Sequence, residues 1–229
     1  MILQSDIRKL PFADCSIDHI YSDPPYGRDA LDCYHWLANE AARILKPGGF
    51  VMAMLGGSYK NQIFKFFDEA GLTYYWDYSF RMQGAQTGIV WKHSAGGNKP
   101  IVIRTKSVLI YSKGPSISRT GTADLVDALD SGQNWKQFHR WGQSAAVARY
   151  YIDCFTAEGD LVLDPFVGGG SSALGAMMIN RRFAGCDIDP LALKASLANI
   201  NGDAVAMPEG SLFAGVEVGN EQKTYMELR

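Results

Sequence analysis

The four residues Asp23-Pro24-Pro25-Tyr26 form the first group in the chain that could carry out chemistry. They follow an apolar run at residues 17–22, "IDHIYS", which is typical of a buried strand. Each proline fixes its own φ at about −65° and restricts the residue before it to extended geometry, so we expect a stiff turn. The Asp23 carboxylate and the Pro24 carbonyl can then point at one spot as paired acceptors. Tyr26 offers a ring face beside them.

Two acceptors that converge on one point suit an NH₂ group, and an adjacent ring face suits a planar base. An exocyclic amine on a heteroaromatic ring is a poor nucleophile because its lone pair is conjugated with the ring. If both N–H bonds are held out of the ring plane, the lone pair is directed toward an incoming electrophile. The turn therefore predicts chemistry on such an amine, against the competing reading of a rigid turn with no chemical role.

A second group lies in "LVLDPFVGGGSSALGA", residues 161–176, where a buried strand runs into a glycine cluster and then a helix. This arrangement lets backbone N–H groups at a helix N-terminus approach a ligand closely. Gly168-x-Gly170-x-x-Ala173 satisfies the dinucleotide fingerprint, and Asp187 follows the next strand, where an acid can accept hydrogen bonds from ribose hydroxyls. These residues predict a cofactor that contains a nucleoside.

The lead-in to this loop, Asp164-Pro165-Phe166, differs from dinucleotide sites, which place a glycine directly after the strand. The difference favours another nucleoside cofactor over a nicotinamide dinucleotide. A tight turn without a ligand is the competing reading of the glycines.

The elements that must position both groups follow from an alternation of apolar runs with stretches of helical periodicity. The predicted strands span residues 17–22, 47–55, 73–80, 107–114, 160–166 and 182–189, and the predicted helices span about 30–45, 62–70, 145–155, 171–181 and 191–200. Strands that alternate with helices call for an α/β fold with a mostly parallel sheet covered on both faces. The strand at 107–114 is the candidate for an antiparallel position.

The length of 229 residues suits one large domain. The chain has no run of about 18 apolar residues, and its first ten residues offer no apolar signal-peptide core. We therefore expect a cytoplasmic protein with no membrane contact. The four cysteines show no C-x-x-C spacing, so we expect no metal site, and none of them follows a proline, as the nucleophile of a cytosine-C5 methylase would.

Charge is distributed unevenly along the chain. Residues 92–149 hold nine Lys or Arg against three Asp, a local charge of +6, while the net charge of the whole chain is −2. A basic segment on an acidic body fits local contact with nucleic acid, although a solvated face of mixed charge would give the same pattern.

The motif "SDPPYG", followed after a long interval by "LDPFVGGGSS" and "GCDIDP", resembles the DNA amino-methyltransferases, which use S-adenosylmethionine to methylate adenine N6 or cytosine N4. The order of the motifs resembles the circularly permuted β group, and the resemblance runs from about residue 2 to residue 200. It implies a Rossmann-like methyltransferase fold in permuted motif order. The implied divisions are a catalytic half at 1–92, a short basic target-recognition region at 93–142, a cofactor-binding half at 143–202 and a tail at 203–229.

The resemblance also implies roles for individual residues. Asp23 and Pro24 would hold the target amine, Pro25 would complete the turn, and Tyr26 would stack on a base flipped out of the duplex. The residues implied for the cofactor are Asp164, Phe166, Gly168, Gly170 and Ser171 at the methionine part, Asp187 at the ribose, and Asp6 at the adenine.

Further candidate residues concern a departure from the family pattern and the contacts with DNA. Gln143 stands where many relatives carry part of a Lys-Pro pair, and it could contact the cofactor carboxylate or have a plain surface role. Arg104, Lys113, Arg119 and Arg140 are the candidate DNA contacts, with phosphate rather than a base edge as the expected partner. A short recognition region favours a short or relaxed target sequence.

The predicted function is transfer of a methyl group to adenine N6 in double-stranded DNA. Adenine is preferred over cytosine N4 because relatives with Ser in place of Asp23 lean toward cytosine. The competing function classes are methylation of RNA or of a protein glutamine, a nicotinamide-dependent oxidoreductase and a DNA-binding module without turnover. A homodimer would add DNA-contact surface to a chain of this size.

Overall fold

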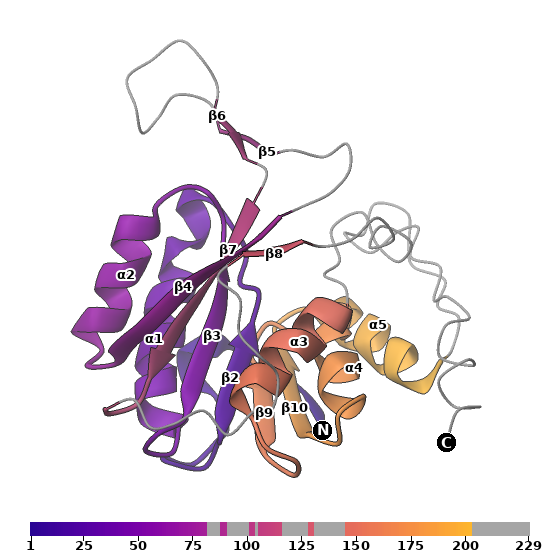
Figure 1. Cartoon of the computed structure of the whole chain (residues 1–229). Helices are drawn as coiled ribbons and strands as arrows, with labels where there is room; N and C mark the ends of the chain where they lie inside the picture. The colour runs from indigo at the N-terminus through magenta and orange to yellow at the C-terminus, as the bar shows by residue number, and fades with distance from the viewer. Residues whose placement is uncertain (82–87, 91–100, 104, 116–127, 131–144, 203–229) are drawn as a thin grey trace.

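The sheet of this protein is built from segments distant in the sequence, with the N-terminal strand beside one from the last quarter of the chain. The computed structural model describes residues 1–81, 88–90, 101–103, 105–115, 128–130 and 145–202 (Figure 1). Within these ranges, eight strands form one mixed sheet in the order β1-β10-β9-β2-β3-β7-β4-β8, and β5 and β6 form a separate antiparallel pair.

The strands and helices have the following bounds. The strands are β1 (Ile2–Gln4), β2 (His19–Ser22), β3 (Phe50–Leu55), β4 (Thr73–Arg81), β5 (Gly88–Val90), β6 (Ile101–Ile103), β7 (Thr105–Ser112), β8 (Ala128–Asp130), β9 (Leu161–Asp164) and β10 (Arg182–Asp187). The helices are α1 (Leu31–Ile44), α2 (Lys60–Glu69), α3 (Ala145–Phe155), α4 (Ser171–Met177) and α5 (Pro190–Asn201).

Strand β7 runs against its neighbours β3 and β4, whereas β1, β10, β9, β2 and β3 are mutually parallel. The prediction of a mostly parallel sheet with one antiparallel strand is therefore confirmed. All six residues of β3 and all four of β2 are buried, because both strands lie in the middle of a sheet that is covered on both faces.

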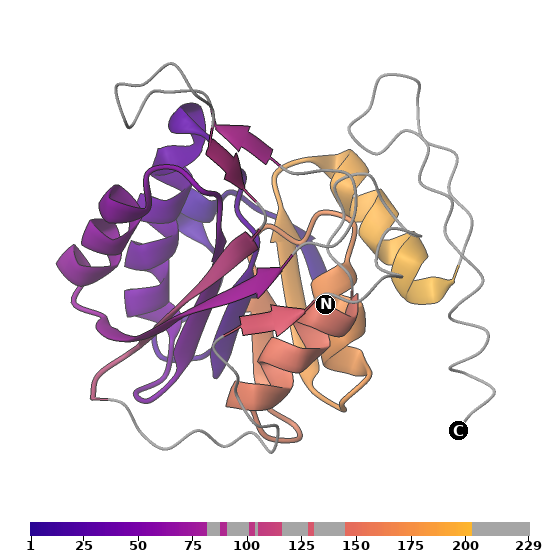
Figure 2. The same ribbon diagram turned by 45° about the horizontal axis from the view of Figure 1, so that its top comes forward.

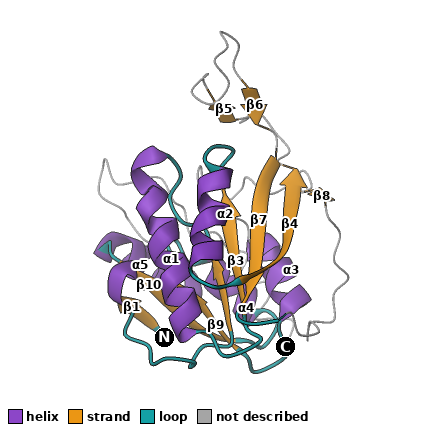
Figure 3. Ribbon diagram, turned by 90° about the vertical axis from the view of Figure 1, so that its left-hand side faces the viewer, coloured by secondary structure: helices purple, strands orange, loops and turns teal. Residues whose placement is uncertain are grey.

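Helices cover the two faces of the sheet (Figure 3). α1 and α2 pack on one face, over the apolar side chains of Ile20, Val51 and Leu109. α3 packs on the other face, over Met52 and Ile110, and α5 packs against α4, β1 and β10. None of the helices within the described ranges has the length and apolarity needed to cross a bilayer.

The structure adds two details to the predicted organisation. The predicted strands lack β1, β5, β6 and β8, because three residues are too few to show an alternation of apolar and polar positions. The predicted recognition region at 93–142 contains β7, which pairs along most of its length with β3 and β4. Residues 105–112 are thus part of the central sheet, and the other described residues of that region are only β6, residues 113–115 and β8.

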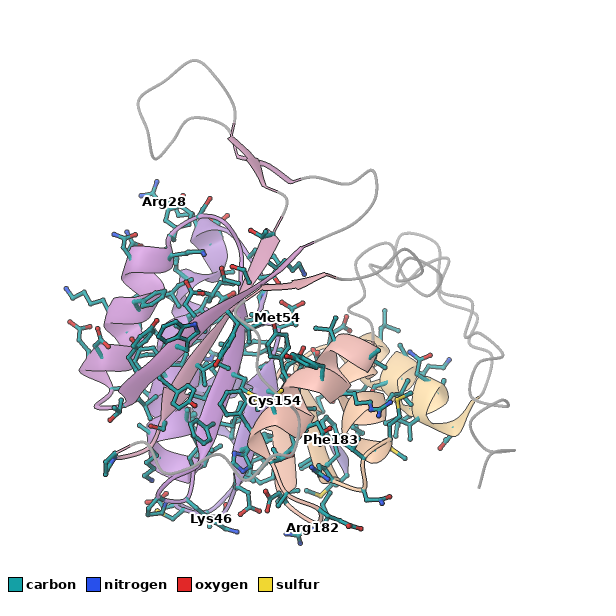
Figure 4. All side chains as sticks on the ribbon, in the orientation of Figure 1. Arg28, Lys46, Met54, Cys154, Arg182 and Phe183 are labelled. Atoms are coloured by element: carbon teal, nitrogen blue, oxygen red, sulfur yellow. The ribbon has the colours of Figure 1, made fainter. Side chains whose placement is uncertain are left out.

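The carboxyl ends of the parallel strands share one edge of the sheet, which comes forward in Figure 2. We call it the carboxyl edge. β7 begins at this edge because it is antiparallel, so Thr105 and Lys106 lie near the ends of β3 and β2. Arg28 lies toward this edge in Figure 4, and Lys46 and Arg182 lie at the opposite one.

Candidate active site

The Asp23 turn follows directly from β2 at the carboxyl edge. Pro24 is buried, Pro25 is exposed, and Tyr26 is 42% exposed, so part of its ring is open to an incoming ligand. The Tyr26 hydroxyl donates a hydrogen bond to Asp23 Oδ1. Gly56, just past β3, lies so close that a Cβ there would come within 3.3 Å of the Tyr26 ring. The ring is therefore supported by the end of β3.

A cation completes this cluster. Lys106 Nζ lies 3.6 Å from Asp23 Oδ2 and 5.0 Å from the centroid of the Tyr26 ring. The side chains of Lys106 and Asp23 are 21% and 22% exposed, so the pair sits in a partly desolvated position. The turn thus presents a carboxylate that is already in contact with a phenol and an ammonium group.

The glycine loop begins at Asp164, the last residue of β9, whose carboxylate is enclosed by neutral donors. Ser22 Oγ donates to Asp164 Oδ1 at 2.6 Å and Ser172 Oγ donates to Oδ2 at 2.6 Å. The backbone N–H of Phe166 also donates to Oδ1, at 3.0 Å. Burial raises the pKa of Asp164 to about 6, against the hydrogen bonds from Ser172 and Ser22, which lower it.

This carboxylate ties the two sequence motifs together. Ser22 is the residue immediately before the Asp23 turn, and Ser172 lies in the first turn of α4, just after the glycine loop. One buried side chain therefore fixes the position of the Asp23 turn relative to the loop, although 142 residues separate Ser22 from Asp164. Its oxygens are occupied within the protein, so its relation to a cofactor is to hold the loop rather than to lie on the loop surface.

The glycines of the loop adopt conformations that other residues rarely take. Gly168 and Gly170 have φ of +49° and +85°. A Cβ at Gly170 would lie 2.6 Å from Ser196 Oγ of α5, whereas among the described residues Cβ atoms at Gly168 and Gly169 would meet nothing closer than 3.8 and 3.7 Å. Gly169 and Gly170 thus face α5, and among the described residues only the position at Gly168 leaves open space beside the loop.

Asp187 ends β10 and holds the same loop from the next strand. Its Oδ2 accepts from the N–H of Gly168 and its Oδ1 from the N–H of Asp189, both at 3.0 Å. Burial raises the pKa of Asp187, although these backbone donors oppose the shift. The Asp187 carbonyl also accepts from Ser5 N at 3.1 Å, so the segment after β1 lies beside it.

Asp6 follows this segment and therefore lies near Asp187 at the carboxyl edge. Its carboxylate accepts from the backbone N–H and the guanidinium of Arg8, and these hydrogen bonds lower the pKa of Asp6. Both acids are therefore placed at adjacent strand ends, on the side of the glycine loop away from the Asp23 turn.

The structure gathers most of the predicted site residues at one edge. Those brought together there are Asp23, Pro24, Pro25, Tyr26, Asp164, Phe166, Gly168, Gly170, Ser171, Asp187 and Asp6. Gln143, Arg104, Arg119 and Arg140 lie outside the described residues.

Lys113 is not brought to this edge. It follows β7 at the opposite end of the sheet, where its Nζ donates to the Arg43 carbonyl at 3.1 Å and lies 3.3 Å from Cys15 Sγ. Lys113 is therefore separated from the Asp23 turn by about the length of β7.

Sequence reasoning missed two contacts of the site, the Tyr26 hydroxyl with Asp23 and Lys106 with both residues. The motif points only to the ring face of Tyr26, and charge places Lys106 only within the basic segment. The available signal is the antiparallel direction predicted for 107–114, since an antiparallel strand must begin at the carboxyl edge and bring the residues before it to the site.

The sequence of this chain is similar to those of DNA methylases. A family model described as DNA methylase matches residues 127–198. The Type II methyltransferase M.HpaI of Haemophilus parainfluenzae is 25% identical over 217 residues, which cover 76% of this chain and 65% of that protein. The chain thus spans a little less than two thirds of the length of this relative.

Solved structures share the fold. The PvuII DNA methyltransferase, which is cytosine-N4-specific, has a TM-score of 0.71 with 17% identity over 100% of this chain and 91% of its own. The M1.HpyAVI–SAM complex has a TM-score of 0.61 with 20% identity over 80% of this chain and 88% of its own. At this identity the structures establish the fold alone, and the predicted Rossmann-like methyltransferase fold is confirmed.

Proposed function

Because the chain is a relative of the N6-adenine and N4-cytosine DNA methylases, we propose that it transfers a methyl group from S-adenosylmethionine to the exocyclic N6 amine of an adenine flipped out of duplex DNA. The observation that carries the proposal is the Ser22–Asp164 hydrogen bond. It places a turn suited to an amine directly beside a loop suited to a nucleoside cofactor, on adjacent parallel strands.

The residues at the carboxyl edge fit this cofactor. Among the described residues, a Cβ at Gly168 would meet only the Phe166 carbonyl oxygen, at 3.8 Å, which leaves room for a ligand against the backbone there. The Asp187 carboxylate suits ribose hydroxyls, and the Asp6 carboxylate suits the amine of an adenine ring. When bound, S-adenosylmethionine supplies an activated methyl group on a positively charged sulfur.

The protein's own contribution is to hold the acceptor. Asp23 and the Pro24 carbonyl accept the two N–H groups of the target amine, and the Tyr26 ring stacks on the base. As the amine nitrogen forms its bond to the methyl carbon, the bond between that carbon and the sulfur breaks and the nitrogen becomes positive. The Asp23 carboxylate beside it stabilises that charge until the nitrogen loses one of its protons to solvent. The buried Ser22–Asp164 tie fixes the distance between the two reactants, so that alignment supplies much of the rate enhancement.

Adenine is proposed over cytosine because the turn begins with Asp23 rather than Ser. Cytosine N4 is the second candidate, since the cytosine-N4-specific PvuII enzyme shares the fold and both amines suit the same two acceptors.

The test is to incubate the purified protein with unmethylated duplex DNA and S-adenosylmethionine, digest the DNA to nucleosides and identify the product by mass spectrometry. N6-methyladenine is the expected product. If the product is N4-methylcytosine, the assigned site residues stand and the target base is cytosine instead of adenine. The absence of both products would overturn the proposal.

A further inference from the structure

Lys106 contacts the same two groups that the proposed function assigns to the target base. Its Nζ lies 3.6 Å from Asp23 Oδ2 and 5.0 Å from the centroid of the Tyr26 ring. One side chain thus engages both the acceptor for the amine and the ring on which the base would stack.

The chemistry of the ammonium group resembles that of the base in both contacts. An ammonium N–H is a donor to a carboxylate, as an amine N–H is, and a cation over an aromatic ring takes a position that a stacked base would also use. Lys106 therefore makes, without DNA, the two interactions that a flipped base would make.

The charges of the reacting groups indicate that Lys106 contacts Asp23 in the protein without a bound base. During methyl transfer the target nitrogen becomes positive, and the Asp23 carboxylate stabilises it. An ammonium group that stays beside Asp23 offsets part of that stabilisation and repels the new positive charge. An arrangement that favours the transition state would move this cation away from the carboxylate.

The contact is weak enough to be exchanged. A separation of 3.6 Å is longer than the roughly 2.7–2.9 Å of a tight charge-assisted hydrogen bond, and both side chains retain contact with solvent. Such pairs contribute little to stability, and the flexible lysine stem lets the ammonium group turn toward a DNA phosphate.

We propose that Lys106 is a placeholder for the target amine, which occupies Asp23 and Tyr26 in the base-free protein and is displaced when the base enters. The inference rests on the proposed function. It makes Lys106 a residue that sets how strongly the exocyclic amine contributes to binding.

The experiment compares two duplexes that contain the target site mapped from the methylated product. They differ only in the target nucleotide, which is either the natural base or an analogue without the exocyclic amine: purine for adenine, 2-pyrimidinone for cytosine. Phosphate contacts are common to both duplexes, and the weaker base pairing of the analogue affects every variant alike. A change in the ratio of the two Kd values between variants therefore reports the contact between the amine and the protein. This ratio is measured for the wild type and for Lys106→Met, which removes the charge and keeps an unbranched stem.

The expected ratio for Lys106→Met is about two- to fivefold larger than for the wild type, because the amine no longer competes with an ion pair of this kind. Lys106→Arg keeps a cation and should stay near the wild-type ratio. The matched control is Lys60→Met, because Lys60 Nζ bonds Ser107 Oγ near the same edge, and its ratio should not change. Binding of S-adenosylmethionine to each variant verifies that it is folded.

An equal or smaller ratio in Lys106→Met would overturn the placeholder role while the proposed function stands, provided that the wild type methylates DNA. If the wild type neither methylates DNA nor distinguishes the two duplexes, the proposed function fails and the inference falls with it.

Discussion

Two Asp-Pro pairs stand at the ends of the neighbouring parallel strands β2 and β9, yet their carboxylates have opposite surroundings. Asp23 is partly exposed and contacts the Tyr26 hydroxyl and the Lys106 ammonium. Asp164 is 4% exposed and accepts hydrogen bonds from neutral donors of the protein.

The difference shows that the Asp-Pro dipeptide determines the direction of the backbone, whereas the side chains that contact the carboxylate determine what the carboxylate does. In both cases the proline keeps the aspartate extended, so the chain leaves its strand in a defined direction. Around Asp164 the short side chains of Ser22 and Ser172 donate to both carboxylate oxygens, so that the residue links β2, β9 and α4. Around Asp23 the partners come from longer, more flexible side chains, so the carboxylate stays within reach of a substrate.

The largest effect expected from this comparison is that of Asp23→Ala. The variant should lose roughly 10²–10³-fold in methylation rate, because it lacks the acceptor that stabilises the positive nitrogen. Its affinity for S-adenosylmethionine should stay within a few-fold, since the tie at Asp164 remains. Methyl transfer to DNA and cofactor titration measure the two quantities, and an active variant would break the distinction between the two aspartates.

The second prediction concerns the pH dependence that burial gives to Asp164. Its pKa of about 6 lies above the unfolded value of about 4, so the folded protein holds a proton that the unfolded chain has already lost. The wild type should therefore lose about 2 kcal/mol of stability, relative to Asp164→Asn, as pH rises from 4 to 7. Urea unfolding of both proteins across this range measures the difference.

A variant without one of the hydrogen-bond donors to Asp164 tests the second prediction more closely. Ser172→Ala removes a hydrogen bond that lowers the pKa of Asp164, so its stability should fall more steeply with rising pH than that of the wild type. Parallel curves for the wild type and Asp164→Asn would show that Asp164 does not titrate as its surroundings require.

The third prediction tests how tightly the glycine loop after Asp164 is packed against α5. Gly170→Ala should destabilise the protein by about 2 kcal/mol, because φ is +85° and the new Cβ would meet both the hydroxyl and the backbone of Ser196. Gly169→Ala is the matched control: its Cβ would meet Asn199 Nδ2 at 3.7 Å, an ordinary contact, and the expected change is within about 0.5 kcal/mol. Thermal and urea unfolding measure both, and equal effects would contradict the packing argument.

The smallest effect belongs to the Tyr26 hydroxyl on the Asp23 side. Tyr26→Phe keeps the ring and removes one hydrogen bond to a partly exposed carboxylate, so we expect about a fivefold fall in kcat. Tyr74→Phe, at the far end of β4, is the control. An unchanged rate in Tyr26→Phe would mean that Asp23 is positioned without the phenol.

The sequence is sufficient for features that depend on local pattern. The helix predicted at 145–155 has those bounds in the structure, and the predicted strand at 107–114 is antiparallel, as β7. The strand ends also predict that the acids gather at one edge. These features follow from apolar periodicity and from the rule that parallel strands share a carboxyl edge.

Contacts between distant side chains are beyond such reasoning. No periodicity relates Ser22 to Asp164, and no spacing selects Lys106 from the nine basic residues of 92–149 as the partner of Asp23. Lys113, seven residues further along the same segment, is a predicted DNA contact that lies at the opposite edge, because one strand length separates the two positions.

The junction of β2 with β9 also governs how the protein is made. Strand β2 leaves the ribosome early, and its partner β3 follows after about 30 further residues have been synthesised. Its other partner, β9, follows only after some 140 residues. At about 5–20 residues per second, the nascent chain carries an open strand edge for on the order of ten seconds, a template for pairing with other chains. Because the Asp23 turn and the glycine loop lie on either side of this late junction, a ligand that needs both cannot stabilise the half-made protein.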